Sequence, residues 1–161
     1  HAYRGKEMYD ESIAVFKKAI EINPTLVDAY FNLGVSYGKK GLLDEEIQQY
    51  KKVLDLNPNS AEAHFNLGIA YGEKKMFEHQ VGEYKKAIAI NPKYAKAYKN
   101  LESTYRKKGM KEEADKELSR YNNLVKHWSC KMIGRKCGYL ILFTLCCEVI
   151  HDKEEEMQDD W

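Results

Sequence analysis

The sequence repeats itself with a period of 34 residues. Tyrosines recur at that spacing, namely Tyr3, Tyr37, Tyr71 and Tyr105. Asn-Pro pairs begin at the equivalent positions Asn23, Asn57 and Asn91. A fixed period in this range is typical of stacked repeats and not of a single globular core. The sequence therefore predicts a scaffold in which each unit packs on the next, and such scaffolds mostly bind other molecules.

Each unit holds two helical patterns joined by a turn. In the unit 27–60, apolar and small residues recur at helical spacing up to a turn at Gly41, and a second pattern runs from there to Asn57-Pro58. Proline cannot continue a helix, so we expect the second helix to end at this pair. We expect Asp44 to cap that helix. Gly34 and Gly68 should let the two helices of a unit approach closely.

This pattern resembles the tetratricopeptide repeat family, whose signature is W-x2-L-G-x2-Y…A-x3-F…P. The second and third units read Tyr30-x2-Leu33-Gly34-x2-Tyr37 and His64-x2-Leu67-Gly68-x2-Tyr71, each closed by a proline. The resemblance implies an all-α fold, a right-handed α-solenoid of helix-turn-helix repeats. We divide the chain into units 1–26 (incomplete at its start), 27–60, 61–94 and 95–126, about three and a half repeats, followed by a C-terminal extension at 127–161.

Three departures from the family pattern affect the expected packing. Glu46 and Gln80 replace the small residue found early in the second helix, and we expect these long side chains to turn outward or to snorkel. Glu102 replaces the glycine of the fourth unit, and no proline closes that unit. An atypical last unit fits a capping role.

The family resemblance also implies where a ligand would bind. The first helix of each unit lines the concave face, which places Asn32, Asn66 and Asn100 in a row along it. A carboxamide offers both a donor and an acceptor, so such a row can hold the backbone of an extended peptide. The other residues that we expect in this groove are Phe31, Phe65, Val35 and Ile69 as apolar pockets, and Lys96, Lys99 and Arg106 as a basic end. For each set the alternative is structural. The asparagines then solvate the inner face or pair between helices, the basic residues solvate the surface, and the phenylalanines belong to the core.

The expected partner is thus another protein or peptide, extended and acidic at one end. A clamp for acidic chaperone C-termini is not expected, because Phe31 and Val35 stand where that clamp needs Lys and Asn. The net charge of +1 does not favour nucleic acid. No nucleophile, paired carboxylates or phosphate loop suggests catalysis, so we expect no enzyme, small-molecule substrate or cofactor. The cysteine and histidine spacings match no compact zinc finger, and we expect no metal.

The extension 127–161 differs in composition from the repeats. It holds all four cysteines, an apolar run at 138–147 and an acidic end. The run is too short to span a membrane, and membrane contact is not expected. A cap on the last repeat is one interpretation. In another, the module serves assembly or self-association, with its groove idle or filled by its own acidic tail. In a third, the chain is a non-catalytic arm of a larger protein. A cytoplasmic location is favoured.

Overall fold

The computed structural model describes the backbone of residues 2–133 and the side chains of residues 8–126. The chain divides into one unit at His1–Leu124 and a second at Val125–Trp161. Of the second unit, only the end of a helix is described. The apolar run at 138–147 and the acidic end lie outside the described residues, and so does the interpretation of the tail as a cap or an internal ligand.

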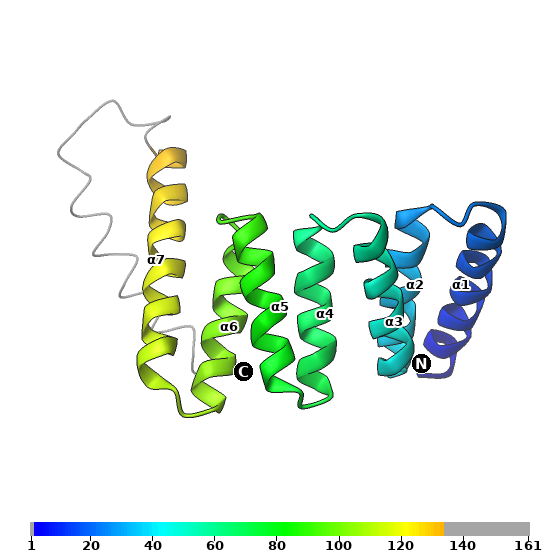
Figure 1. The fold of residues 1–161 in the computed structure, drawn as a ribbon, viewed down its shortest axis with the longest axis horizontal. Helices are drawn as coiled ribbons and strands as arrows, with labels where there is room; N and C mark the ends of the chain where they lie inside the picture. The colour runs from blue at the N-terminus through cyan, green and yellow to red at the C-terminus, as the bar shows by residue number, and fades with distance from the viewer. Residues whose placement is uncertain (1, 134–161) are drawn as a thin grey trace. The chain divides into compact units, whose positions relative to one another are not determined.

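Within the described residues the fold consists of helices without a strand, which confirms the predicted all-α solenoid. The helices are α1 (Ala2–Ile22), α2 (Val27–Lys40), α3 (Leu43–Leu56), α4 (Ala61–Glu73), α5 (Phe77–Ile90), α6 (Ala95–Lys107) and α7 (Lys111–Ile133). Within His1–Leu124 the helices follow one another in a row, in chain order (Figure 1). Each helix from α1 to α5 packs against the next one along the chain.

Glycine and proline set most of the helix ends. Gly41 and Gly109 follow α2 and α6 with φ values of 75°, in the left-handed region that glycine adopts without steric cost. Lys75 occupies the equivalent position after α4 with a φ of 60°. The helices α3 and α5 end directly before their Asn-Pro pairs, as predicted. Between Lys111 and Ile133 the sequence has neither glycine nor proline, and α7 accordingly continues past residue 126.

The prediction that Asp44 caps the second helix of its unit is wrong. The helix α3 begins at Leu43, and its N-cap residue, Leu42, makes no side-chain cap. Asp44 therefore lies inside the first turn, where its negative charge still favours the positive end of the helix dipole. The side chain that does cap a helix is Ser60, whose hydroxyl accepts a hydrogen bond from the Ala63 N–H at 3.2 Å.

The apolar core is divided among the helix–helix interfaces, as stacking predicts. One cluster joins α1 to α2 through Ile13, Leu33 and Tyr37. A second joins α3 to α4 and contains Ile47, Tyr50, Leu67, Ala70 and Tyr71. The third continues from α4 to α7 and contains Phe65, Tyr84, Ala87, Ala97, Leu101, Tyr105 and Ala114.

Gly34 and Gly68 mark the close approach of the two helices in a unit, as predicted. A Cβ atom at Gly34 would lie 3.0 Å from the ring of Tyr50, and one at Gly68 would lie 2.7 Å from the ring of Tyr84. Both tyrosines are almost completely buried. The glycines thus provide the space in which these two rings pack.

The prediction that Glu46 and Gln80 turn outward is wrong. The Glu46 side chain is only 8% exposed, and its carboxylate lies 2.7 Å from where a Cβ of Gly38 would be. Gln80 covers Gly72 in the same way, with its Cδ 2.7 Å from the corresponding point. Each long side chain therefore fills the space left by a glycine on the first helix of its own unit.

An ion pair of constant register links each unit to the next. A lysine late in the first helix of one unit pairs with an acidic residue early in the second helix of the unit before it. The pairs are Lys40 with Asp10, Lys74 with Asp44 and Lys108 with Glu78. The lysines are partly buried while the acidic partners are exposed. Such pairs fix register more than they add stability.

Candidate functional site

The first helices of the units are α2, α4 and α6, and we call the surface made by their predicted ligand positions the α2–α4–α6 face. It is formed by the positions that the family resemblance assigned to the ligand. On α2 the exposed residues Asp28, Asn32, Val35 and Lys39 follow helical spacing along this face. On α4 the face is lined by Glu62, Asn66, Ile69, Gly72 and Glu73, and on α6 by Lys96, Lys99, Asn100, Ser103, Arg106 and Lys107.

The three asparagines of this face differ in their hydrogen bonds. Asn32 donates its side-chain N–H to the backbone carbonyl of Asp28 at 2.8 Å. Asn100 donates to the hydroxyl of Tyr84 at 3.4 Å. Both hydrogen bonds use the side-chain N–H and not the side-chain oxygen, and the carboxamide of Asn66 forms none of this kind among residues 8–126. Each asparagine therefore retains at least an acceptor for a ligand.

The four apolar residues expected in the groove are placed at different depths. Phe65 is only 8% exposed and packs between Tyr84 and Tyr94, with ring centroids 5.6 and 5.0 Å away. Phe31 is half-buried, 5.5 Å from the ring of Tyr50. Val35 is 36% exposed. Phe65 thus belongs to the core, and the accessible apolar surface comes from Val35 and from parts of Phe31 and Ile69.

The basic end of the face is only partly free of internal partners. Arg106 is paired with Glu102 and lies 3.4 Å from the carboxylate of Asp115. The hydrogen bond and the charge of Glu102 raise the pKa of Arg106, so its charge is retained but locally balanced. Lys96 and Lys99 are exposed, and neither forms an ion pair within the described part of the chain. These two lysines carry the available positive charge.

The charge of the face changes sign between α4 and α6. Glu62 and Glu73 lie near the two ends of α4. The residues 34 positions later, at the equivalent places on α6, are Lys96 and Lys107. A ligand that lies across both helices therefore meets an acidic surface on one and a basic surface on the other.

Beneath the acidic part of the face lies the carboxylate of Glu46. Burial, and then the charge of Glu73, raise the pKa of Glu46 to about 7. Burial also raises the pKa of Tyr50, followed by the charges of Glu46 and Glu62. Glu46 therefore feels the charge of Glu73, and Tyr50 feels the charges of Glu46 and Glu62.

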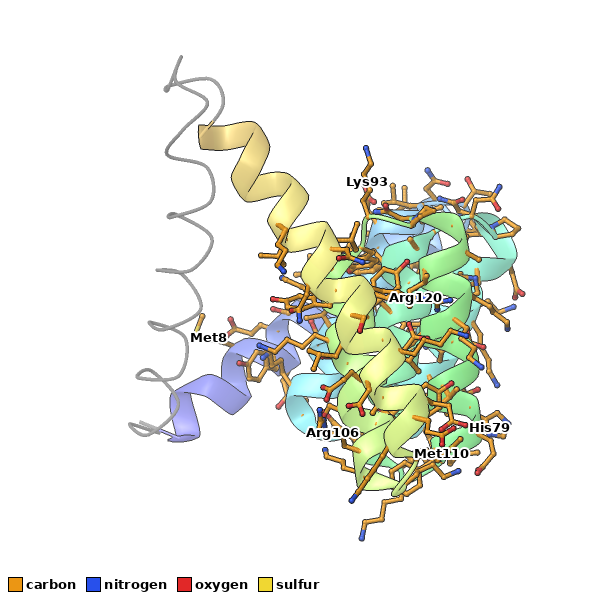
Figure 2. The ribbon with its side chains drawn as sticks, turned by 90° about the vertical axis from the view of Figure 1, so that its left-hand side faces the viewer. Met8, His79, Lys93, Arg106, Met110 and Arg120 are labelled. Atoms are coloured by element: carbon orange, nitrogen blue, oxygen red, sulfur yellow. The ribbon has the colours of Figure 1, made fainter. Side chains whose placement is uncertain are left out.

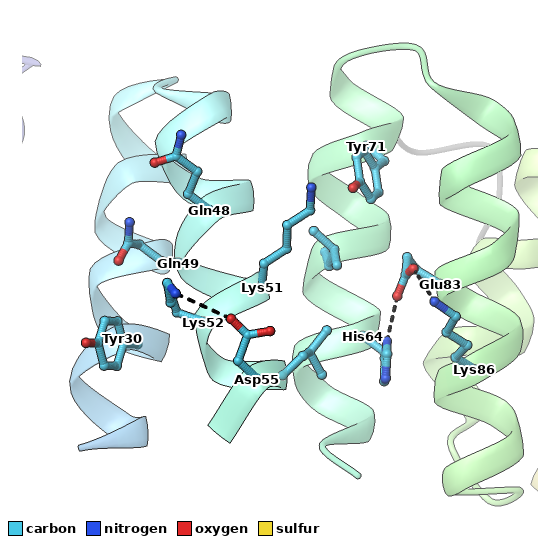
Figure 3. A pocket seen from close by; sticks show the side chains of 12 residues that line it. Tyr30, Gln48, Gln49, Lys51, Lys52, Asp55, His64, Tyr71, Glu83 and Lys86 are labelled. Atoms are coloured by element: carbon cyan, nitrogen blue, oxygen red, sulfur yellow. Dashed lines mark hydrogen bonds and ion pairs between the residues drawn. The ribbon is translucent and has the colours of Figure 1, made fainter. Parts of the chain in front are cut away.

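A cavity of about 730 Å³ lies elsewhere, between α3 and α5 over α4 (Figure 3). None of the ten predicted groove residues lines it. Its walls carry charged and amide groups, including Lys51, Asp55 and the His64–Glu83 pair, in which Nδ1 and Oε2 are 2.6 Å apart. We give more weight to the α2–α4–α6 face, because an extended ligand needs an open surface. In the cavity, Asp55 pairs with Lys52, and Glu83 pairs with both His64 and Lys86.

His64 takes the place of a tyrosine found in the neighbouring units. Tyr30 and Tyr98 donate their hydroxyls to the carbonyls of Pro24 and Pro92 at 3.2 and 3.3 Å. His64 instead pairs with Glu83, whose other oxygen accepts a hydrogen bond from Lys86 at 2.8 Å. The structure thus gives His64 a packing and pairing role.

Within the described residues, no group of three His, Cys, Asp or Glu side chains could hold a metal ion. The cysteine side chains lie outside that part. Of the helices that are described, none is sufficiently long and apolar for a membrane crossing.

Comparison with family models agrees with the repeat pattern. A model described as TPR repeat matches residues 1–41 and 42–75, and one described as Tetratricopeptide repeat matches residues 61–94. The chain belongs to the tetratricopeptide repeat family. Proteins built from these repeats are typically non-catalytic scaffolds. By fold and family, this chain is a scaffold for protein–protein interaction. A search of curated proteins found no match.

Solved structures with this fold include several of the protein MamA. One, titled "Crystal structure of MamA", is 30% identical with a TM-score of 0.69, and the match covers 75% of this chain and 71% of that chain. MamA from Desulfovibrio magneticus RS-1 is 21% identical with a TM-score of 0.70, with coverage of 75% and 68%. The form titled MamA MSR-1 C2 is 23% identical with a TM-score of 0.66, with coverage of 78% and 72%.

The contact of Glu46 with Gly38, and of Gln80 with Gly72, was not predicted from the sequence. A signal was present in the repeat register. In the units 27–60 and 61–94 a glycine late in the first helix accompanies a long side chain at 46 or 80, whereas the last unit has Arg106 and Ala114. This exchange of small and large residues indicates that the two positions touch.

Proposed function

We propose that the chain binds an extended segment of a partner protein along the α2–α4–α6 face. The proposal is supported chiefly by Asn32, Asn66 and Asn100, which recur in register. The hydrogen bonds of Asn32 and Asn100 engage their side-chain N–H groups and leave the side-chain oxygens as acceptors. An extended backbone exposes N–H groups that such oxygens can accept. The interaction involves no chemical step.

The other residues of the face give this proposal its chemical detail. Val35, with Phe31 and Ile69 beside it, would contact apolar side chains of the segment. Phe65 would support these contacts from the core. Lys96 and Lys99 would favour acidic residues over α6, while Arg106 contributes less because Glu102 and Asp115 already neutralise it.

A peptide array probed with the full chain tests the proposal. The variant Asn32→Ala, Asn66→Ala, Asn100→Ala should lose binding of the peptides that the wild type retains. A matched variant, Asn59→Ala, Asn122→Ala, Asn123→Ala, changes three exposed asparagines away from the face and should bind as the wild type does. Circular dichroism would check the helical content of both. Equal binding by both variants and the wild type would contradict the proposal.

The alternative of self-association is favoured by one observation. Met8, Val15 and Ile22 lie seven residues apart on α1 and are 66%, 64% and 79% exposed. Met8 points away from the packed helices (Figure 2). A stripe of this kind matches the seam through which two helices pack. Sedimentation equilibrium of the wild type and of Val15→Lys tests it, and a monomer at every concentration would contradict it.

A further inference from the structure

The cavity between α3 and α5 carries functional groups that the α2–α4–α6 face does not use. We call it the α3–α5 cavity. Its volume is about 730 Å³, and its lining includes Leu54 and Leu67 together with charged side chains from α3 and α5 (Figure 3). Apolar residues with a small number of polar groups among them are typical of the lining of a ligand site.

Each carboxylate of this cavity is already balanced by a cation of its own helix. On α3, the carboxylate of Asp55 lies 3.5 Å from the ammonium of Lys52. On α5, Glu83 accepts a hydrogen bond from Lys86 at 2.8 Å, and its other oxygen lies 2.6 Å from Nδ1 of His64. These groups therefore present little free charge to a ligand.

Lys51 differs from these paired groups. It lines the cavity, is exposed and extends from α3 toward α4 (Figure 3). Whereas Lys52 and Lys86 pair with carboxylates of their own helices, Lys51 forms no ion pair within residues 8–126. The cavity therefore has a positive charge that the described part of the chain leaves uncompensated.

At other unit boundaries the equivalent lysine contacts a tyrosine ring of the next unit. Lys17 lies over the ring of Tyr37, and Lys85 lies over the ring of Tyr105. Each ammonium is 5.9 Å from the ring centroid. The face of an aromatic ring attracts a cation through its quadrupole. In these two places the charge of the lysine therefore has a partner inside the protein.

Lys51 and Tyr71 stand in the same register, but among the described residues this contact is found only for the two equivalent pairs. The ring of Tyr71 lies instead against the ring of His79, with the centroids 5.0 Å apart. The units 27–60 and 95–126 have Glu45 and Glu113 in the place of His79. The aromatic neighbour of Tyr71, and with it the free Lys51, is thus specific to this boundary.

The hydroxyl of Tyr71 is a second donor in the same cavity. Tyr71 lines the cavity, and in Figure 3 its hydroxyl lies on the side of Lys51. Unlike the hydroxyls of Tyr30 and Tyr98, it donates to no backbone carbonyl among residues 8–126. An ammonium and a hydroxyl that share a cavity can donate to the two oxygens of one carboxylate.

We propose that the α3–α5 cavity binds a carboxylate, with Lys51 and Tyr71 as its donors. The apolar stem of the acid would pack on Leu54 and Leu67. A phosphate dianion fits less well, because the carboxylates of the lining would repel its second charge. The carboxylate belongs to an acidic side chain of a partner protein or to a small free acid, two sources that share this chemistry. The site is separate from the α2–α4–α6 face and does not depend on the proposed function.

An NMR titration of the full chain with the peptide acetyl-Ala-Ala-Glu-Ala-Ala-amide tests this site. Saturable shifts should appear at the amides of Lys51 and Tyr71. The same peptide with glutamine in place of glutamate should cause none. Succinate, a small free acid, identifies the source. Tighter binding of the peptide assigns the site to a protein partner, and tighter binding of succinate assigns it to a free acid.

Matched substitutions one repeat apart test the two donors. Lys51→Gln should weaken the glutamate peptide at least about tenfold, because a hydrogen bond between charged groups is lost. The equivalent change Lys85→Gln should leave the affinity unchanged, since Lys85 already lies over a tyrosine ring. Tyr71→Phe should weaken the peptide less than Lys51→Gln does, and Tyr105→Phe should not weaken it. Circular dichroism would check the helical content of all four variants.

Three results would overturn the inference. They are no saturable shift with the wild type, equal shifts with the glutamate and glutamine peptides, and an affinity that Lys51→Gln does not change or that Lys85→Gln lowers equally. The variant Asn32→Ala, Asn66→Ala, Asn100→Ala should bind the glutamate peptide in the cavity as the wild type does, because none of these residues lines it. Failure of this site and failure of the proposed function are therefore distinguishable.

Discussion

The units 27–60 and 61–94 have the same helices and nearly the same register, but they solve one packing problem with different chemistry. Glu46 and Gln80 both fill the space above a glycine. The amide of Gln80 joins a hydrogen-bonded group with Tyr84 and Asn100, whereas the carboxylate of Glu46 has no partner within the described residues. The comparison teaches that a repeat can keep its packing while changing the charge that it presents to a ligand.

The largest difference between the two units should appear in the pH dependence of stability. The folded pKa of Glu46 is about 7, above its ordinary value of 4.5. The native state therefore holds this proton more tightly than the unfolded state does. The stabilisation that comes from this tighter proton binding is fully present below pH 4.5 and is lost as the pH rises through 7.

Glu46→Gln should remove this loss, because glutamine does not titrate. Above pH 7 we expect the variant to be more stable than the wild type by about 2 kcal/mol, with little difference in acid. Urea unfolding across the pH range measures it. Gln80→Glu should also make the free energy of unfolding fall as the pH rises, but by less. The reason is that Lys107 occupies, one repeat later, the position equivalent to Glu73. Parallel curves for the wild type and Glu46→Gln would contradict the assignment.

The next largest effect on stability is expected at the two glycine–tyrosine contacts, and it should differ between them. A Cβ at Gly68 would lie 2.7 Å from the Tyr84 ring, against 3.0 Å for Gly34 and Tyr50. We expect Gly68→Ala to destabilise by about 1–3 kcal/mol, as other overpacked cores do, and Gly34→Ala to destabilise less. Urea midpoints for the two variants measure this difference.

Gly82→Ala provides the control for these glycines. Gly82 lies within α5, and no heavy atom lies within 4 Å of its would-be Cβ. Alanine there should stabilise by about 0.5–1 kcal/mol through helix propensity alone. Stabilisation by all three alanines would show that the space around Gly34 and Gly68 is larger than the structure indicates.

Substitutions in the turns of the two units should change the free energy of unfolding by a smaller amount. Gly41 and Lys75 both have positive φ, which costs a residue with a side chain about 1–2 kcal/mol. Lys75→Gly should therefore stabilise by about 1 kcal/mol, and Gly41→Lys should destabilise by a similar amount. Thermal unfolding of both variants would test the pair. No gain from Lys75→Gly would mean that the lysine side chain offsets the strain by other contacts.

The smallest effect is expected from the ion pairs between units. Asp44→Asn removes the exposed partner of Lys74 and should cost between about 0.2 and 1 kcal/mol at low salt. Glu78→Gln, at the equivalent place, should also destabilise slightly, because the hydrogen bond from Lys108 lowers the pKa of Glu78. Both effects should vanish in concentrated salt, which screens exposed charges. Persistence of either effect there would point to packing instead of charge.

The sequence by itself determined the architecture. The period, the turn glycines and the Asn-Pro pairs predict where helices start, end and stack, because these depend on local backbone chemistry and on an apolar stripe that only a neighbouring unit can cover. The family follows from the same residues. For the candidate site, the register predicts which residues of α2, α4 and α6 stand at equivalent positions, since they lie one period apart.

Only the tertiary structure decided what each of these residues is free to do. Helical register places Phe65 and Phe31 alike, but Phe65 is closed in by Tyr84 and Tyr94 while Phe31 is half-buried. Likewise, a glutamate in the position of Glu46 could turn to solvent or inward. It turns inward because Gly38, on the neighbouring helix α2, leaves space for its carboxylate. That space exists only where the two helices pack together, so the pattern of one helix cannot predict it.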